Sequence, residues 1–346
     1  MTQPEPTVDA VTADLLPHLV RLGPNLWGAS FKLMKMVPAH HIVSTAVAAG
    51  DIGPQTVIIE STSGTFGLAL ALNAALIGRR LILVTDPAMD ERLCRRVTDL
   101  GASIVMCPTP SALGEFQTVR LARLAQVRTQ HPDHFWPRQY DNPLNAASYS
   151  VVAEHLARQL GQVDALIGPV GSGGSMCGTA DVLRTHNPQL HTIGVDTPGS
   201  VLFGQPDSVR ELRGLGNSVL PRILDHGAFD DVHWCPAADA YQETRRLHRK
   251  HALFHGPTSG AAMAVARWWA DRNPDARTVV MLPDQGDRYS DTVYDDSWLD
   301  AKPARRAPTD SAPREVTRPT GEASWTWMRW GRRALADLRP DTATTP

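Results

Sequence analysis

The stretch from residue 58 to residue 86, IIESTSGTFGLALALNAALIGRRLILVTD, limits the possible folds of this chain more than any other. Residues 57–59 are apolar and typical of a buried strand, and a hydroxyl-rich turn follows them. Residues 66–77 have the composition of an apolar helix, and residues 81–84 form a second apolar run. Because two parallel strands need a crossover between them, this order predicts a βαβ unit with a Ser/Thr-rich loop at the start of its helix.

The same alternation of apolar strand and helix continues along most of the chain. The sequence predicts further strands at residues 103–106, 165–167, 191–195 and 279–282, and further helices at residues 90–100, 112–130, 150–160, 176–184 and 259–270. Nearly continuous apolar strands of this kind indicate an α/β fold with mainly parallel sheets that helices cover on both faces. We therefore predict two three-layer αβα domains.

The domain boundaries follow from where these blocks begin and end. We expect residues 1–39 and 149–300 to form a larger domain, and residues 40–148 a smaller, mobile one. Residues 301–346 are expected to be a Pro/Arg-rich linker and an amphipathic tail, with a short basic helix at residues 324–335. This helix would dock on the protein's own body or on a sister subunit, with a membrane surface as the alternative.

Composition excludes several classes of partner. The chain has 346 residues and a formal net charge of −2, so it has no basic excess for nucleic acid or an anionic membrane. No apolar run approaches the ~18 residues of a membrane span, and the N-terminus lacks the pattern of a secretory signal. His251 and His255 have helical spacing but no carboxylate motif beside them, so we expect no metal site. Four scattered cysteines form no CxxC pair, which favours free thiols in the cytoplasm.

Two further small-residue turns stand beside predicted helices. Residues 168–175, GPVGSGGS, follow a strand and begin a helix, so their N–H groups and hydroxyls could cradle a phosphate. A dinucleotide fingerprint fails there because Met176 occupies the place of its last glycine, although Asp196 keeps a nicotinamide enzyme as an alternative. Residues 256–262, GPTSGAA, also begin a helix. The loop at residues 61–65 suits a carboxylate better than a phosphate.

These loops, in this order, resemble those of the cysteine synthase and cystathionine β-synthase family of pyridoxal-phosphate enzymes. Residues 61–67, STSGTFG, resemble the family's PTSGNTG loop, which receives the substrate carboxylate. Residues 171–175, GSGGS, resemble its GTGGT phosphate cup, and residues 258–262, TSGAA, resemble its SSGAA turn. Residues 139–145 and 283–289 resemble its QFxNPxN and PDSGERY motifs.

The resemblance extends over residues 17–299 and implies fold type II, the tryptophan synthase β-like fold, with pyridoxal 5'-phosphate as cofactor and a homodimer as the assembly. It implies cofactor-binding roles for Lys35, Thr65, Gly171, Ser172, Gly173, Gly174, Ser175 and Thr258. It implies substrate-binding roles for Thr62, Ser63, Gly64 and Gln139, and Arg138 stands beside the last of these. Gln139 is expected to reach the substrate from the other domain.

The lysine that holds the cofactor has two candidates. An ungapped alignment with the family's SVKDRPA, counted back from Glu60, places that lysine on Lys35. Lys32 is the alternative and needs a three-residue gap. We favour Lys35 because its alignment needs no gap, and its apolar neighbours do not fit a solvated surface lysine. Thr65 replaces an Asn of the family that bonds the ring oxygen of the cofactor, and the strand before the lysine looks shortened.

The implied activity is β-replacement on an activated L-serine, either O-acetylserine or O-phosphoserine, with Lys35 as the base that removes the α-proton. The substrates would be small amino acids. An alternative is a synthase of a diaminopropionate-type precursor that uses an amine or amino acid as nucleophile. An alternative of another class is a non-catalytic binding protein with the same fold. Arg138 is expected to meet a second negative charge on one of the substrates.

Overall fold

The structure, a computed structural model, describes residues 9–110, 116–212, 214–303 and 312–338. The chain divides into two compact units. The smaller unit consists of Met1–Leu16 and Leu33–Ser148, and the larger of Pro17–Lys32 and Tyr149–Pro346. We had expected residues 1–39 to belong wholly to the larger unit, and the division instead assigns Lys35 to the smaller one.

The smaller unit contains a four-stranded parallel sheet in the order β5-β4-β3-β6. Its strands are β3 (Val57–Ser61), β4 (Leu81–Thr85), β5 (Ala102–Met106) and β6 (His134–Phe135). Its helices are α1 (Ala10–Ala13), α2 (Met36–Ala49), α3 (Thr65–Leu76), α4 (Glu91–Asp99), α5 (Phe116–Thr129) and α6 (Pro143–Ala147). The predicted βαβ unit is therefore β3-α3-β4. The predicted helix at residues 112–130 is described from Phe116 onward, and its first residues lie outside the described part.

Helices cover both faces of this sheet. Ile58 belongs to a core that includes side chains of α2, α3 and α4, whereas Val57 and Ile59 pack with Leu124 and Val127 of α5. Successive side chains of a strand point to opposite faces, so an all-apolar strand such as β3 must be covered twice. The unit has the predicted three layers.

The larger unit contains an eight-stranded sheet in the order β1-β2-β10-β7-β8-β9-β12-β11. Strands β2, β10, β7, β8 and β9 are parallel, and β1 pairs antiparallel with β2. The strands are β1 (His18–Arg21), β2 (Leu26–Ser30), β7 (Ala165–Pro169), β8 (His191–Asp196), β9 (Asp231–Trp234), β10 (Thr278–Leu282), β11 (Arg314–Glu315) and β12 (Thr326–Arg329). The strand before the candidate lysines, expected to be shortened, is thus the five-residue β2.

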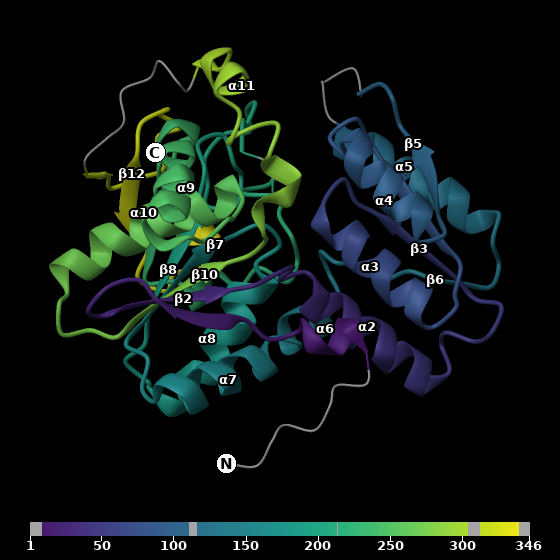
Figure 1. Ribbon diagram of the computed structural model, residues 1–346, viewed down its shortest axis with the longest axis horizontal. Helices are drawn as coiled ribbons and strands as arrows, with labels where there is room; N and C mark the ends of the chain where they lie inside the picture. Colours follow the sequence, from purple (N-terminus) through teal and green to yellow (C-terminus); the bar gives the residue numbers. More distant parts are fainter. Residues whose placement is uncertain (1–8, 111–115, 213, 304–311, 339–346) are drawn as a thin grey trace, which may run out of the picture. The chain divides into compact units, whose positions relative to one another are not determined.

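Two pairs of helices cover this sheet. In Figure 1, α9 and α10 lie over one face and α7 and α8 over the other. Apolar side chains of β7, β8 and β10 pack with those of α9 and α10 in one core. The helical elements are α7 (Ser150–Leu160), α8 (Gly174–His186), η1 (His226–Ala228), α9 (Ala237–His251), α10 (Pro257–Arg272), η2 (Gly286–Tyr289), α11 (Asp296–Asp300) and η3 (Leu335–Leu338). The fold is the predicted α/β fold with mainly parallel sheets.

The tail differs from the prediction. Thr326–Arg329 is the strand β12, which pairs antiparallel with β9, and not part of a helix. Met328 and Trp330 are buried while Arg329 between them is exposed, and this alternation is the period of a strand. The open edge of β9 supplies the backbone partners that a short isolated helix would lack. The tail docks on its own unit, and residues 304–311 of the expected linker lie outside the described part.

Candidate active site

The expected carboxylate loop connects the end of β3 to the first turn of α3. Thr62 is buried, and its Oγ1 accepts a hydrogen bond of 3.3 Å from the N–H of Gly64. A Cβ on Gly67 would lie 2.9 Å from the Thr62 methyl group, so this glycine lets the loop pack against the helix. The first-turn N–H groups and the dipole of a 12-residue helix favour an anion here. Ser63 is half-buried at this end of the helix, so the loop suits a carboxylate.

Gln139 lies beside this loop, in the same unit. Its side-chain Nε2 donates to the backbone carbonyl of Ser61 at 3.4 Å. Its backbone carbonyl accepts a hydrogen bond from Nδ2 of Asn145 at 2.7 Å. The expectation that Gln139 reaches the substrate from the other domain is therefore wrong. The βαβ order placed residues 61–65 and 139 far apart in the chain, and the pairing of β3 with β6 brings them together.

Arg138 has an unusual backbone. Its φ is 56°, in the left-handed region that residues other than glycine rarely adopt. Its side chain is 47% exposed, and its Nε lies 3.8 Å from Oδ1 of Asp141. Residues held in such a conformation cluster at functional sites because the surrounding structure must impose the strain. The strained backbone presents a largely exposed guanidinium next to Gln139.

Glu60, which the sequence analysis did not single out, organises this region. Its Oε1 accepts from the Ser61 N–H at 2.7 Å and from the indole of Trp136 at 3.0 Å, and its Oε2 accepts from the Gln139 N–H at 3.3 Å. Burial is the main cause that raises the pKa of this carboxyl, to about 7. An acidic residue at the end of an otherwise apolar strand was the available signal, because a buried carboxyl needs partners.

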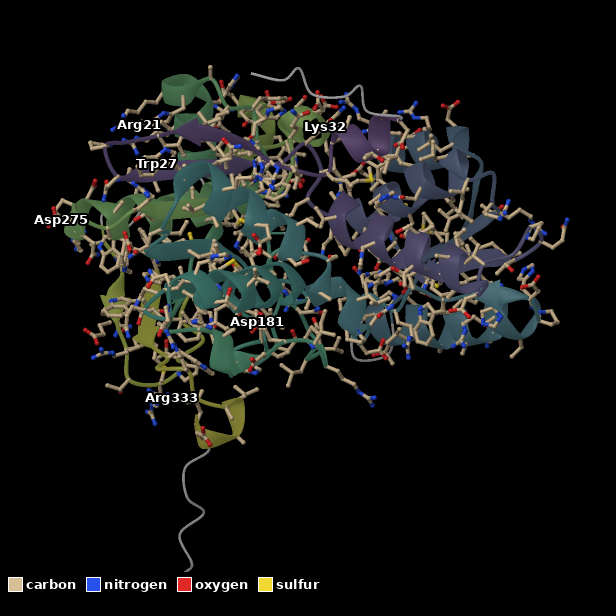
Figure 2. The ribbon with its side chains drawn as sticks, turned by 90° about the horizontal axis from the view of Figure 1, so that it is seen from below. Arg21, Trp27, Lys32, Asp181, Asp275 and Arg333 are labelled. Carbon is tan, nitrogen blue, oxygen red and sulfur yellow. The ribbon has the colours of Figure 1, made fainter. Side chains whose placement is uncertain are left out.

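The two candidate lysines differ in environment. Lys35 precedes α2 and is half-buried between the buried side chains of Met34 and Met36. Burial lowers the pKa of its amine to about 8. Lys32, in the larger unit, is exposed (Figure 2). An amine whose pKa lies closer to physiological pH has a larger neutral fraction than an ordinary lysine and reacts more readily as nucleophile and base, which favours Lys35.

The expected phosphate cup lies between β7 and α8. Gly173 is the N-cap of α8 with a φ of 88°, and a Cβ there would lie 2.7 Å from a methyl group of Leu224. Only glycine fits this position, for conformation and for space. Ser172 and Gly174 are buried on either side of it. Backbone N–H groups and a hydroxyl at the start of a 13-residue helix make a donor set that fits a phosphate.

Thr258 lies in the first turn of α10, close to the same end of the sheet. A Cβ on Gly214 would lie 3.7 Å from Thr258 Oγ1, and a Cβ on Gly171 would lie 3.3 Å from the carbonyl of Gly214. The structure therefore brings Gly171 of the cup and Thr258 close to the same residue, Gly214, in the loop of residues 214–216. Sequence reasoning missed this loop, although its Gly-Leu-Gly pattern within an irregular stretch was a usable signal.

Asp196 and His255 are engaged in contacts that belong to the fold itself. Asp196 is buried, its Oδ1 accepts from the Thr197 N–H at 2.8 Å, and burial raises its pKa to about 7. Gly216 packs so closely against Asp196 that a Cβ on this glycine would not fit, so a ribose would not reach Asp196. The ring nitrogens of His255 lie 2.9 Å from Ser30 Oγ and 2.7 Å from the Asp284 carbonyl. Among the described residues, no group of His, Cys, Asp and Glu side chains could hold a metal ion.

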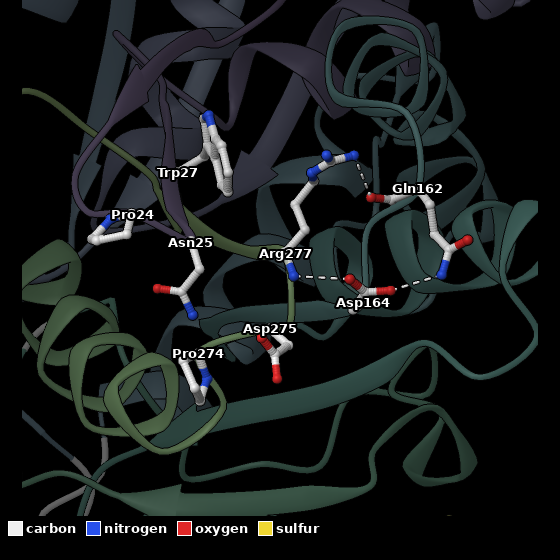
Figure 3. Close-up of a pocket in the computed structure, with 8 residues that line it drawn as sticks. All are labelled: Pro24, Asn25, Trp27, Gln162, Asp164, Pro274, Asp275 and Arg277. Atoms are coloured by element: carbon white, nitrogen blue, oxygen red, sulfur yellow. Dashed lines mark hydrogen bonds between the residues drawn. The ribbon is translucent and has the colours of Figure 1, made fainter.

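A pocket in the larger unit lies at the opposite end of the strands (Figure 3). It adjoins the amino ends of β2, β7 and β10, whereas ligands of parallel sheets bind at the carboxyl ends. Its polar groups bond one another: Asp164 accepts from Gln162 Nε2 and from the Arg277 N–H. The lining residues are Pro24, Asn25, Trp27, Gln162, Asp164, Pro274, Asp275 and Arg277. We do not place the active site there.

Comparisons with known proteins identify the family of this chain. Residues 22–284 match the family described as pyridoxal-phosphate dependent enzyme. The chain belongs to this family. It is 37% identical over 276 residues to the N-(2-amino-2-carboxyethyl)-L-glutamate synthase of Cupriavidus metallidurans, covering 78% of this chain and 81% of the relative. It is 35% identical over 312 residues to the enzyme of the same name from Ralstonia nicotianae, covering 87% and 92%.

A solved structure shares the fold as well. The O-acetylserine dependent cystathionine β-synthase of Helicobacter pylori is 26% identical, with a TM-score of 0.76 over 82% of this chain and 97% of that one. Membership of the pyridoxal-phosphate family makes this chain a cofactor-dependent enzyme of the cysteine synthase type. In the larger unit, the donor set of residues 171–175 and the Thr258 hydroxyl fit groups of that cofactor. In the smaller unit, the Lys35 amine, whose pKa is lowered, fits the lysine that it requires. The family match leaves no support for a nicotinamide enzyme or for a non-catalytic binding protein. Among the described residues, no helix is long and apolar enough to cross a membrane.

Proposed function

We propose that this enzyme joins an activated L-serine to the amine of a second amino acid, with glutamate as the first acceptor to test. The similarity to two N-(2-amino-2-carboxyethyl)-L-glutamate synthases over most of the chain carries this proposal. That product name describes a serine skeleton whose Cβ is bonded to the nitrogen of glutamate. The bond from Cβ to the leaving-group oxygen breaks, a bond from Cβ to nitrogen forms, and the amine loses a proton.

Each residue has a distinct part in this proposal. When bound, pyridoxal phosphate supplies a ring that stabilises negative charge on the substrate Cα. Lys35 holds the cofactor and takes the proton from Cα, helped by its lowered pKa. The loop formed by Thr62, Ser63 and Gly64 binds the substrate carboxylate at the start of α3, together with Gln139.

The cofactor contacts are assigned in the same way. Residues 171–175 bind the phosphate through their N–H groups and serine hydroxyls. Thr258 presents its hydroxyl to the pyridine nitrogen, and a hydroxyl in place of a carboxylate favours elimination and replacement over transamination. Thr65 takes the place of the family's Asn beside the ring oxygen.

Arg138 supports an acidic substrate. Its exposed guanidinium belongs to the residue next to Gln139, and we expect it to meet a phosphate leaving group or the side-chain carboxylate of glutamate. A charge-assisted contact of this kind contributes about 1.5–3 kcal/mol. We expect Arg138→Ala to lose roughly ten- to a hundredfold in kcat/KM for the charged substrate.

The test combines two donors with two acceptors. O-phosphoserine and O-acetylserine are each supplied with glutamate or sulfide, and the products are measured by mass spectrometry. Wild type should favour the glutamate adduct, and Arg138→Ala should lose it selectively while Arg138→Lys retains part of it. Arg123→Ala, at an exposed arginine of α5, is the matched control. Cysteine as the main product, or equal losses with every substrate pair, would contradict this assignment.

We also propose that the enzyme works in the cytoplasm as a homodimer. Cys107, Cys177 and Cys235 are buried free thiols and Cys94 is a half-buried one, which suits a reducing compartment. The dimer is the assembly that the family resemblance implies. Light scattering coupled to size-exclusion chromatography would show a monomer if this is wrong.

A further inference from the structure

The C-terminal tail is built into the larger unit beyond the end of the family match at residue 284. The side chain of Trp330, just after β12, is fully buried. Its backbone N–H donates to the Asp230 carbonyl at 2.7 Å, and its indole N–H donates to the Arg333 carbonyl at 2.8 Å. Arg332 adds an ion pair of 2.8 Å with Asp230. Figure 1 shows this yellow segment beside the large sheet.

The Trp330 indole packs on aromatic residues of the irregular segment that follows β8. Its ring centroid lies 5.1 Å from that of Phe203, edge to face, and 5.7 Å from that of His226. Phe203 and His226 also contact each other edge to face at 5.4 Å. An Nε2 of His226 lies 2.7 Å from the Leu202 carbonyl, so the two parts of the segment are tied together. The indole therefore packs against both rings of this cluster.

The other side of the same turn supports the cup. Leu224, two residues before His226, lies so close to Gly173 that a Cβ there would be 3.0 Å from the Leu224 Cα. The Asp225 carbonyl accepts a hydrogen bond from the Cys177 thiol, one turn into α8, at 3.6 Å. Residues 224–226 therefore contact the tail on one side and the first turn of α8 on the other.

We propose that Trp330 is a positioning residue for the phosphate cup. The buried indole holds residues 224–226 against Gly173, and this contact fixes the backbone N–H groups at the start of α8 in the geometry that binds the cofactor phosphate. The tail thus sets cofactor affinity without touching the cofactor. This inference rests on the proposed location of the cup at residues 171–175.

The test compares two tryptophans of the tail. Trp330→Ala removes the contact with the cluster, and Trp330→Phe keeps an aromatic ring there. Trp327→Ala is the matched control, because Trp327 stacks on His233 and packs at a tilt against Trp268, neither of which belongs to this cluster. Gly174→Val is the reference for a damaged cup. Bound cofactor is measured on the full-length holoenzymes by absorbance after equilibrium dialysis, and amide hydrogen exchange of residues 171–177 and 199–226 is followed by mass spectrometry.

We expect Trp330→Ala to weaken cofactor binding about tenfold and to speed amide exchange in both segments. A tenfold change in affinity corresponds to the free energy that a buried aromatic contact typically contributes. Trp330→Phe should recover most of the affinity, and Trp327→Ala should match wild type in both measurements. If Gly174→Val loses cofactor but Trp330→Ala does not, the role of the tail is refuted while the cup stands. If neither loses cofactor, the cup lies elsewhere and both assignments fall. If Trp330→Ala does not fold, Arg332→Ala replaces it, because this variant releases the Asp230 ion pair that holds the tail in place. Weaker cofactor binding and faster exchange are then expected in Arg332→Ala, and wild-type values in both measurements would refute the proposal.

Discussion

At the scale of single residues, the environment of an amine separates the two candidate lysines. Lys35 and Lys32 are three positions apart, and both stand in an apolar stretch of sequence. Lys35 is half-buried between buried side chains, with a pKa lowered to about 8, whereas Lys32 is exposed. Desolvation disfavours the charged ammonium, so a larger fraction of Lys35 is neutral and reactive at physiological pH.

The first prediction at this scale is that Lys35→Ala leaves a folded enzyme without covalently attached cofactor. Borohydride reduction of wild type followed by peptide mass spectrometry should place the cofactor on the peptide that contains Lys35, and the visible band of lysine-bound cofactor should disappear in the variant. Lys32→Ala should keep both signals. Labelling of Lys32 would show that the gapped alignment was correct.

A second prediction concerns the pH dependence that Glu60 imparts. Its pKa rises from 4.5 to about 7 on folding, so the folded state holds the proton more tightly than the unfolded one. The contribution of Glu60 to the free energy of unfolding is therefore fully present below about pH 4.5 and is lost as the pH rises through about 7. The total change in this contribution is on the order of 3 kcal/mol. Glu60→Gln cannot ionise and should lack this slope.

The measurement is chemical unfolding of the cofactor-free protein at pH 5 and pH 8. Relative to Glu60→Gln, wild type should be less stable at pH 8 than at pH 5. Glu91→Gln, at an exposed carboxylate of α4, is the control for removing a charge. A constant difference between wild type and Glu60→Gln across this range would show that Glu60 stays ionised on its hydrogen bonds.

At the scale of elements, close approach of helices explains why small residues stand where they do. The turn at residues 258–262 resembles a family motif, but Gly260 within it also serves packing. A Cβ at Gly260 would lie 2.1 Å from Thr244 Oγ1 and 2.3 Å from the Ala240 carbonyl, both on α9. Backbone atoms cannot move aside cheaply, so this glycine sets the distance between α9 and α10.

We therefore predict that Gly260→Ala destabilises the larger unit by about 1–3 kcal/mol, because it pushes α10 away from α9. Thermal unfolding should show the loss, and cofactor binding should weaken with it since Thr258 is in the same helical turn. Gly23→Ala, where the nearest atom to the new Cβ is at 3.5 Å, should have little effect on the melting temperature. Equal melting temperatures of the two variants would mean that α9 and α10 can move apart without loss of stability.

In the tail, by contrast, the sequence predicted a helix where the structure has a strand. Local composition around residues 324–335 suggested a helix, because basic and aromatic residues recur at nearly helical spacing. The edge of β9 decided the outcome, since a docked strand gains a row of backbone hydrogen bonds as well as burial of Trp330. A sequence read alone does not reveal which edges are open.

At the scale of the whole molecule, the resemblance of the three small-residue loops to those of a known family implied the cofactor. The sequence by itself determined the α/β class, the parallel sheets and the order of these loops. These follow from local signals: apolar runs set β3 and β7, and glycines or hydroxyls mark the starts of α3, α8 and α10. Such features can be predicted from the sequence because residues within a few positions specify a strand or the start of a helix.

Only the tertiary structure decided which distant residues meet. It placed Gln139 beside Ser61 and gave Glu60 its donors. It left Lys35 half-buried and Lys32 exposed, and it set Trp330 against the turn that contacts Gly173. Such contacts depend on which strands pair and which side chains lose water. Both are settled by the packing of the folded unit, because the free energy of burial is a property of all the neighbours together and not of any one stretch of chain.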